Sequence, residues 1–171
     1  MSIFMLNSPA VITLIPLYGT EDNEVLTKKT RRSGIFIVAL MLDQITKNWA
    51  LNNLYSEFRE QSFIPCSIGL HLHCNYGIAF SLMQNWPQIG LLLNLAALCL
   101  LLLLYRKLDY AGIAFLLAGT VGNFLDRMRF GYVIDWFYIG MYFNFADVWL
   151  CIGIVLIFVN VFFKSEKKFV Q

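Results

Sequence analysis

The chain has 171 residues, of which 58% are hydrophobic and 14% are charged, and its formal net charge is +2. Ordinary soluble domains carry about 25% charged residues, so this composition excludes a soluble globular protein and predicts a single integral membrane domain. The charges are confined to a few links between apolar stretches. We therefore expect no nucleic-acid partner.

The N-terminal segment, residues 1–33, contains one short apolar stretch, SPAVITLIPLYG. No basic residue precedes this stretch, two prolines interrupt it, and it is too short to cross a membrane. We expect residues 1–33 to form a flexible or interfacial extension.

Four later stretches are predicted to cross the membrane as helices. A bilayer core needs about 20 helical residues, which the third stretch meets only marginally. The first stretch is the most polar, and the second has an aromatic residue at each end, as is typical of membrane interfaces. The four stretches cover residues 34–51, 86–105, 110–125 and 145–163.

The positions of lysine and arginine predict the orientation. Nine of the 13 basic residues precede the first span, join the second to the third, or follow the fourth. Four crossings put all of these on one side, which the positive-inside rule identifies as the cytoplasm. Both termini are then cytoplasmic, with residues 164–171 as a basic tail. The nine residues are Lys28, Lys29, Arg31, Arg32, Arg106, Lys107, Lys164, Lys167 and Lys168.

Two links, residues 52–85 and 126–144, lie on the outer side in this scheme. The alternating sequence SIGLHLHCNYGIAFSL in the longer link predicts short strands. The sequence YVIDWFYIGMYFNF in the shorter link predicts a small hairpin around Gly140. A turn at Gly140–Met141 would place Asp135 opposite residue 146 or its neighbour, and therefore close to Asp147.

Polar residues inside or beside a span are costly, so each is a candidate for function. Asp43 and Lys47 are four residues apart on one helical face, which favours a mutually neutralising ion pair that supports a nearby site. Asp126 lies beside Arg127, where a structural ion pair or a snorkelling arginine is expected. Asn123 lies one turn before Arg127 and would donate a hydrogen bond into an outer site. Asn144, three residues before Asp147, either caps the last span or serves the same site.

Asp135 and Asp147 are separated by only eleven residues. Two carboxylates close together near lipid would share a proton, as in an aspartic peptidase. The ionised acid then takes a proton from water, while the protonated acid donates one to the scissile carbonyl oxygen. The alternative is that Asp147 only favours the positive end of its helix and Asp135 is a solvated loop acid.

The outer links also contain histidine and cysteine. His71, His73 and Cys74 raise the alternative of a zinc site, although alternate residues on a strand specify no complete ligand set. Cys66 and Cys74 would pair only if the outer side is oxidising.

Five motif blocks together resemble lipoprotein signal peptidase, the type II signal peptidase of bacteria. They occur in the family's order across residues 34–163. The blocks are LDQITK at 42–47, NYGIAF at 75–80, GNFLDR at 122–127, GYVIDWF at 131–137 and FNFAD at 143–147.

The resemblance implies a mainly α membrane protein with four transmembrane helices and a small periplasmic β-cradle. It implies an aspartic endopeptidase that removes the signal peptide from diacylglyceryl-modified prolipoproteins before the lipidated cysteine. Asp135 and Asp147 match the family's catalytic aspartates. The supporting or substrate-contacting positions are matched by Asp43, Lys47, Asn75, Gly77, Asn123, Arg127 and Asn144.

The expected partners are lipidated prolipoproteins and membrane lipids, with no metal or organic cofactor, and the protein is expected to be a monomer. Its expected location is the bacterial inner membrane, as a multi-pass protein with the active site on the periplasmic face. The chain departs from the family in a longer N-terminal segment and a short link between the two aspartates. A proton- or ion-relaying transporter, a non-catalytic scaffold and a family member that has lost activity remain alternatives.

Overall fold

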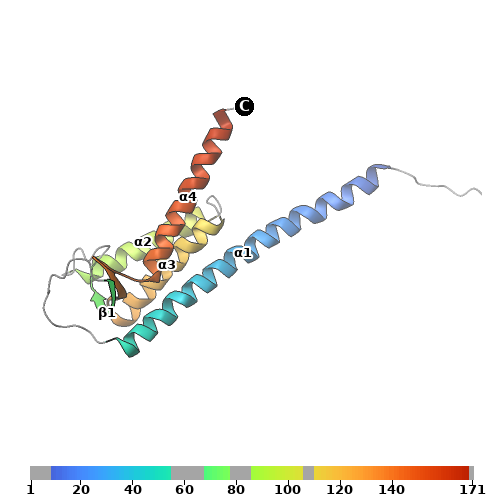
Figure 1. Ribbon diagram of the computed structural model, residues 1–171. Coiled ribbons are helices and arrows are strands. Elements are labelled where there is room, and N and C mark those ends of the chain that lie inside the picture. Colours follow the sequence, from blue (N-terminus) through green and yellow to red (C-terminus); the bar gives the residue numbers. More distant parts are fainter. Residues whose placement is uncertain (1–8, 55–67, 78–85, 106–109, 170–171) are drawn as a thin grey trace, which may run out of the picture.

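The computed structural model describes residues 9–54, 68–77, 86–105 and 110–169, and these form a mainly helical protein with one small antiparallel sheet (Figure 1). The helices are α1 (Pro9–Asn53), α2 (Pro87–Leu104), α3 (Tyr110–Phe130) and α4 (Phe145–Phe169). The strands are β1 (Ile68–Asn75), β2 (Val133–Ile139) and β3 (Tyr142–Phe143).

Two of the helices, α2 over Pro87–Leu104 and α4 over Phe145–Phe163, are long and apolar enough to cross a membrane. Only 11% of each stretch is buried within the protein. Apolar side chains that face outward along a whole helix are suited to contact with lipid rather than water. The predicted first span lies within α1, and the predicted third span lies within α3.

The first helix is longer than the predicted span. It begins at Pro9 and continues to Asn53, so the described part of the N-terminal segment is helical. Its N-terminal half projects beyond the other helices in Figure 1. The interfacial placement expected for residues 1–33 stays a prediction.

Helix α3 is the centre of the fold, because it packs against α1, α2 and α4. Small residues on α3 allow this close approach, as is common between helices in membranes. A Cβ added at Gly112 or Gly119 would collide with α4, and one at Gly122 would collide with the Asp43 carboxylate of α1. The buried Ala114 and Ala118 belong to the same helix.

The three strands pair in the order β1-β2-β3. The hairpin predicted around Gly140 is confirmed, with Gly140 in a left-handed conformation at φ +67°, which glycine adopts without steric cost. The strand predicted in the longer link is confirmed as β1, while residues 78–85 of that link lie outside the described residues.

The predicted pairing of Asp135 with residue 146 or its neighbour across the hairpin is wrong. The β2–β3 pairing consists of Phe137 with Phe143 and Tyr138 with Tyr142. The chain then leaves the sheet, because α4 begins at Phe145. Asp135 is paired instead with His73 of β1.

The crossing of α3 and α4 yields a stability prediction. A Cβ at Gly153 would lie 2.7 Å from the Leu116 side chain and 2.8 Å from the Gly112 carbonyl oxygen. We expect Gly153→Ala to destabilise the protein by about 1–3 kcal/mol through overpacking, measured as a lower midpoint of thermal unfolding in detergent.

The matched control is Gly34→Ala on α1, where an added Cβ meets nothing within 4 Å. This control should be neutral or stabilising, because alanine is favoured over glycine in a helix by about 1 kcal/mol. Equal unfolding midpoints for the two variants would contradict the close α3–α4 crossing.

Candidate active site

The two aspartates lie on different elements at the same end of the helical core. Asp135 is in β2 and only 1% exposed, whereas Asp147 is in the first turn of α4 and partly exposed. The β2–β3 hairpin brings the chain back from Asp135 to the start of α4. The two carboxylates predicted from the sequence to lie close together both bond to Asn144, although one of them is presented by a helix rather than by a strand.

Asn144 bridges the two aspartates. Its side-chain Nδ2 donates to Asp135 Oδ1 at 2.6 Å. Its backbone N–H donates to Asp147 Oδ2 at 3.2 Å, and its Oδ1 accepts from the Asp147 N–H at 3.1 Å. The last two bonds form a reciprocal capping box at the start of α4. The predicted capping role of Asn144 is confirmed, and the same side chain also contacts the site.

Two further asparagines each donate to one aspartate. Asn75, at the end of β1, donates from Nδ2 to Asp135 Oδ2 at 3.0 Å. Asn123 of α3 donates from Nδ2 to Asp147 Oδ1 at 3.0 Å. Each carboxylate thus accepts two hydrogen bonds from groups on different elements, which fixes the orientation of both.

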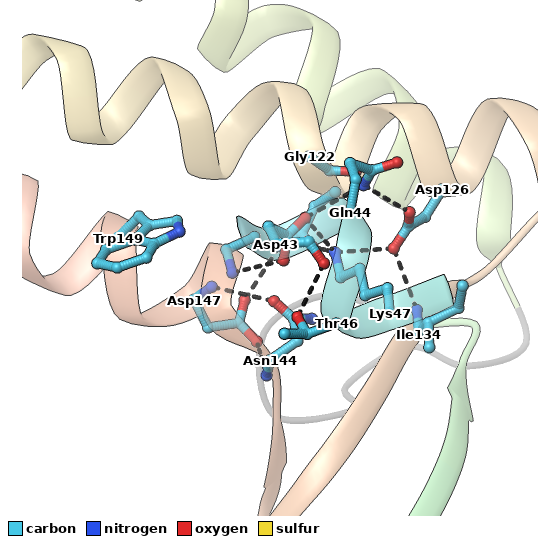
Figure 2. A network of polar contacts seen from close by, with 12 residues as sticks. Asp43, Gln44, Thr46, Lys47, Gly122, Asp126, Ile134, Asn144, Asp147 and Trp149 are labelled. Carbon is cyan, nitrogen blue, oxygen red and sulfur yellow. Dashed lines mark hydrogen bonds and ion pairs between the residues drawn. The ribbon is translucent and has the colours of Figure 1, made fainter. Parts of the chain in front are cut away.

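A buried lysine, Lys47, lies between the carboxylates of Asp43 and Asp126 (Figure 2). Lys47 is 1% exposed, and its Nζ is 3.0 Å from Asp43 Oδ2 and 2.8 Å from Asp126 Oδ2. The same Nζ donates to Asn123 Oδ1 at 2.9 Å. An ammonium group only donates, so Lys47 orients the Asn123 amide with its NH₂ toward Asp147.

The predicted Asp43–Lys47 ion pair is confirmed, but the predicted partner of Asp126 is wrong. Asp126 pairs with Lys47, because β2 and α1 enclose its carboxylate and Lys47 is the cation that reaches it. The Arg127 guanidinium points elsewhere, donating from Nη2 to Gly77 O at 2.8 Å.

The carboxylates of Asp43 and Asp126 also hold the backbone of the elements that carry Asp147 and Asp135. Asp43 Oδ1 accepts from the Ala146 N–H at 2.8 Å, which ties the first turn of α4 to α1. Asp126 Oδ2 accepts from the Ile134 N–H at 3.3 Å, one residue before Asp135. The ion-paired cluster therefore fixes the backbone beside both aspartates.

Sequence reasoning missed Gln44. Its Nε2 donates to Asp43 Oδ2 at 3.1 Å and to Asp126 Oδ1 at 3.2 Å. Its Oε1 accepts from Arg129 Nη1 at 3.0 Å. The sequence signal for Gln44 is an amide side chain in the middle of an apolar span, directly after Asp43.

Arg127 and Gly77 support the end of β1. The Gly77 N–H donates to Asn75 Oδ1 at 2.9 Å, so the Asn75 amide is oriented with its NH₂ toward Asp135. Arg127 holds the Gly77 carbonyl and also donates from Nη1 to Asn123 O at 3.5 Å. Every residue predicted for the site therefore belongs to one connected network.

The histidines lie on the aromatic side of the sheet. His73 stacks on Tyr142 with ring centroids 4.4 Å apart, and burial lowers the pKa of His73. No cluster of three or more potential metal-binding side chains occurs in residues 9–54, 68–77, 86–105 and 110–169. The Cys74 thiol is free, and Cys66 lies outside the described residues.

The electrostatics favour one protonated acid. Burial, followed by the negative charge of Asp147, raises the pKa of Asp135 from 3.8 to about 7. The hydrogen bonds from Asn75 and Asn144 oppose this rise. Near neutral pH the pair thus holds a proton that a solvated carboxyl would lose, which is the condition for one acid and one base to act together.

Comparison with known proteins gives a consistent result. A family profile described as "Signal peptidase (SPase) II" matches residues 35–163. The lipoprotein signal peptidase of Serratia proteamaculans (strain 568) is 34% identical over 151 residues, which cover 78% of this chain and 88% of that protein. The lipoprotein signal peptidase of Clostridioides difficile (strain 630) is 37% identical over 147 residues, covering 78% and 96%.

The fold also matches a solved structure. A bacterial membrane enzyme determined by the in meso method at 2.3 Å resolution superposes with a TM-score of 0.70. It is 24% identical in sequence, and the match covers 81% of this chain and 92% of that one. At this sequence identity, the likeness supports a shared fold and nothing further.

The buried cluster yields a prediction for Lys47. Replacing it by methionine leaves two buried carboxylates without their cation, which costs about 3–5 kcal/mol. We expect Lys47→Met to lower the unfolding midpoint strongly in detergent. Arg129→Met is the control, because Arg129 is exposed and bonded to Gln44. A Lys47→Met protein as stable as the Arg129→Met protein would contradict the role of the cluster.

Proposed function

Because this chain belongs to the signal peptidase II family, we propose that Asp135 and Asp147 are the catalytic pair with which it removes signal peptides from prolipoproteins. The protein is a peptidase of the aspartic class rather than a transport protein or a scaffold. The observation that carries the residue assignment is Asn144, which bonds to both carboxylates at once.

The two aspartates take different roles in this proposal. Asp147 is the ionised base, because it lies at the positive end of α4 and accepts two N–H donors. Asp135 is the acid, because burial and the charge of Asp147 raise its pKa to about 7. Asp147 is also the less buried of the two, which suits contact with water.

The reaction then proceeds by general acid–base catalysis. The oxygen of a water molecule attacks the scissile carbonyl carbon while Asp147 takes a proton from that water. Asp135 gives its proton to the carbonyl oxygen. As the tetrahedral intermediate collapses with cleavage of the C–N bond, the proton held by Asp147 passes to the leaving amine. A hydroxyl proton of the intermediate returns to Asp135, which restores the starting protonation of the pair.

We further propose that the substrate is a diacylglyceryl-modified prolipoprotein, cut before the lipidated cysteine. Its acyl chains hold the substrate at a fixed depth in the bilayer, which supplies part of the orientation that the reaction needs. The three asparagines and Arg127 surround the aspartates and are the groups placed nearest to this substrate.

The proposed topology has four crossings within residues 34–163, with both termini cytoplasmic and the active site on the outer face of the bacterial inner membrane. Arg32 Nη1 donates to Tyr105 O at 3.1 Å, so the start of the first span and the end of the second lie at one level. The aspartates lie at the opposite end of the core, which supports this arrangement. A monomer in contact with membrane lipid completes the proposal.

The catalytic assignment is tested with a lipidated precursor and the full-length protein in detergent or lipid. Asp135→Asn and Asp147→Asn should each lower kcat by about 10⁴-fold or more, because each removes a proton donor or acceptor that acts as part of a pair. Chelation of metals should leave cleavage unchanged.

The control for these variants is Asp126→Asn, the same isosteric change in a buried acid that lies in the supporting cluster. It leaves Lys47 paired with Asp43, so cleavage should fall by no more than about tenfold. Cleavage that survives in both Asp135→Asn and Asp147→Asn would refute the catalytic pair.

The pH dependence of kcat/KM gives a separate test. Asp135 should lose its proton as the pH rises through about 7, leaving two adjacent negative charges and no acid, so activity should decline above that pH. Asn75→Ala removes a hydrogen bond that lowers the pKa of Asp135. The alkaline limb of the profile should therefore move to higher pH in this variant, and a shift to lower pH would contradict the assignment of Asp135 as the acid.

A further inference from the structure

A groove lies between α1 and α2, over α3, at the end of the core away from the aspartates. Its volume is about 200 Å³. Arg32 is roughly 16 Å along α1 from Asp43, at 1.5 Å per helical residue, so the Arg32 end of the groove is separate from the peptidase site. The residues that line it include Arg32, Phe36, Leu98, Leu102, Leu117 and Val121.

The walls of the groove are apolar over most of its length. Helices α1 and α2 each pack on α3, and the space between them is bounded by leucine, valine and phenylalanine side chains. A water molecule in such a space would make few hydrogen bonds, whereas a hydrocarbon chain can fill it without giving up any hydrogen bond. In a bilayer the chemistry of the walls therefore fits an acyl chain.

One end of the groove carries a cation. The guanidinium of Arg32 lies 4.1 Å from the centre of the Tyr105 ring and donates from Nη1 to the Tyr105 carbonyl oxygen. Its Nε is buried and has no hydrogen-bond partner within the described part of the chain. Arginine often binds a phosphate through two parallel hydrogen bonds, and the Nε–H group can be one of the two donors. The guanidinium thus keeps donor capacity for an anion.

The depth of Arg32 fits a lipid headgroup. Arg32 lies two residues before the predicted first span, and Tyr105 is the C-cap of α2, where tyrosine typically marks the membrane interface. Lys28, Lys29 and Arg31 lie on the same stretch of α1 and add positive charge at this level. Basic pockets between transmembrane helices are suited to anionic headgroups.

We propose that this groove binds one anionic phospholipid of the surrounding bilayer, with its phosphate at Arg32 and one acyl chain between α1 and α2. The lipid bridges two helices that each pack on α3 and that are joined by the Arg32–Tyr105 contact. Its headgroup lies at the end of the core opposite the peptidase site, so this lipid is distinct from the lipidated substrate.

The experiment uses the full-length protein in detergent, titrated with phosphatidylglycerol or with phosphatidylethanolamine of the same acyl chains. Binding is followed by native mass spectrometry and by the unfolding midpoint. Wild type should bind phosphatidylglycerol about five- to tenfold more tightly, as expected for one cation at a membrane surface, and should unfold at a higher temperature with it.

The matched variants are Arg32→Gln and Arg31→Gln, which remove the same charge from adjacent residues, of which only Arg32 lines the groove. Arg32→Gln should lose the preference for phosphatidylglycerol, and Arg31→Gln should keep it. Leu98→Trp fills the groove while leaving Arg32 in place, so it should weaken the binding of both lipids. Cleavage of saturating precursor should be the same in Arg32→Gln as in wild type, which separates this proposal from that of the catalytic pair.

Three results would overturn the proposal. The first is equal binding of the two lipids by wild type. The second is an equal loss of preference in Arg31→Gln and Arg32→Gln, which would indicate general attraction to a basic surface. The third is displacement of phosphatidylglycerol by glycerol phosphate without acyl chains, which would indicate a site for soluble anions.

Discussion

The rest of the structure depends on the ion pairs and the hydrogen bond that the buried Lys47 ammonium group makes. A buried cation is costly unless it is paired and hydrogen-bonded, and Lys47 meets this condition with Asp43, Asp126 and Asn123. Those partners belong to two helices, and the carboxylates of Asp43 and Asp126 also accept from backbone N–H groups of α4 and of β2. One charge thus holds together four elements that hydrophobic contact alone would leave free to slide past one another.

The same constraint reaches the chemistry. Because Lys47 holds the oxygen of the Asn123 amide, the nitrogen of that amide is directed at Asp147. Asp147 also takes part in the capping box of α4. The hydrogen bond from the Asn144 N–H that caps the helix therefore also orients the Asp147 carboxylate. The hydrogen bonds that stabilise the start of α4 therefore also preorganise the proposed catalytic pair.

Local patterns made much of this predictable. The hairpin at Gly140, the strand before Asn75 and the Asp43–Lys47 pair all follow from residues within a few positions of each other. The register of the hairpin was predicted wrongly because an ideal ladder was extended past Phe143, where Asn144 ends the sheet by capping α4. Adjacency in the sequence predicts the wrong partner for Asp126, because the Asp126 and Arg127 side chains leave α3 in different directions.

By itself, the sequence determined the membrane class, the chain order of the helices and strands, and the motif blocks with the two aspartates. These features depend on composition and on the spacing of residues that are near one another in the sequence. Tertiary structure alone decided the partners of Lys47, the direction of each asparagine amide and the groove beside Arg32. The physical reason is distance along the chain: Lys47 and Asn123 are 76 residues apart, and Asp43 and Ala146 are 103 apart. Contacts over such separations depend on how the helices pack around α3, which no local pattern specifies.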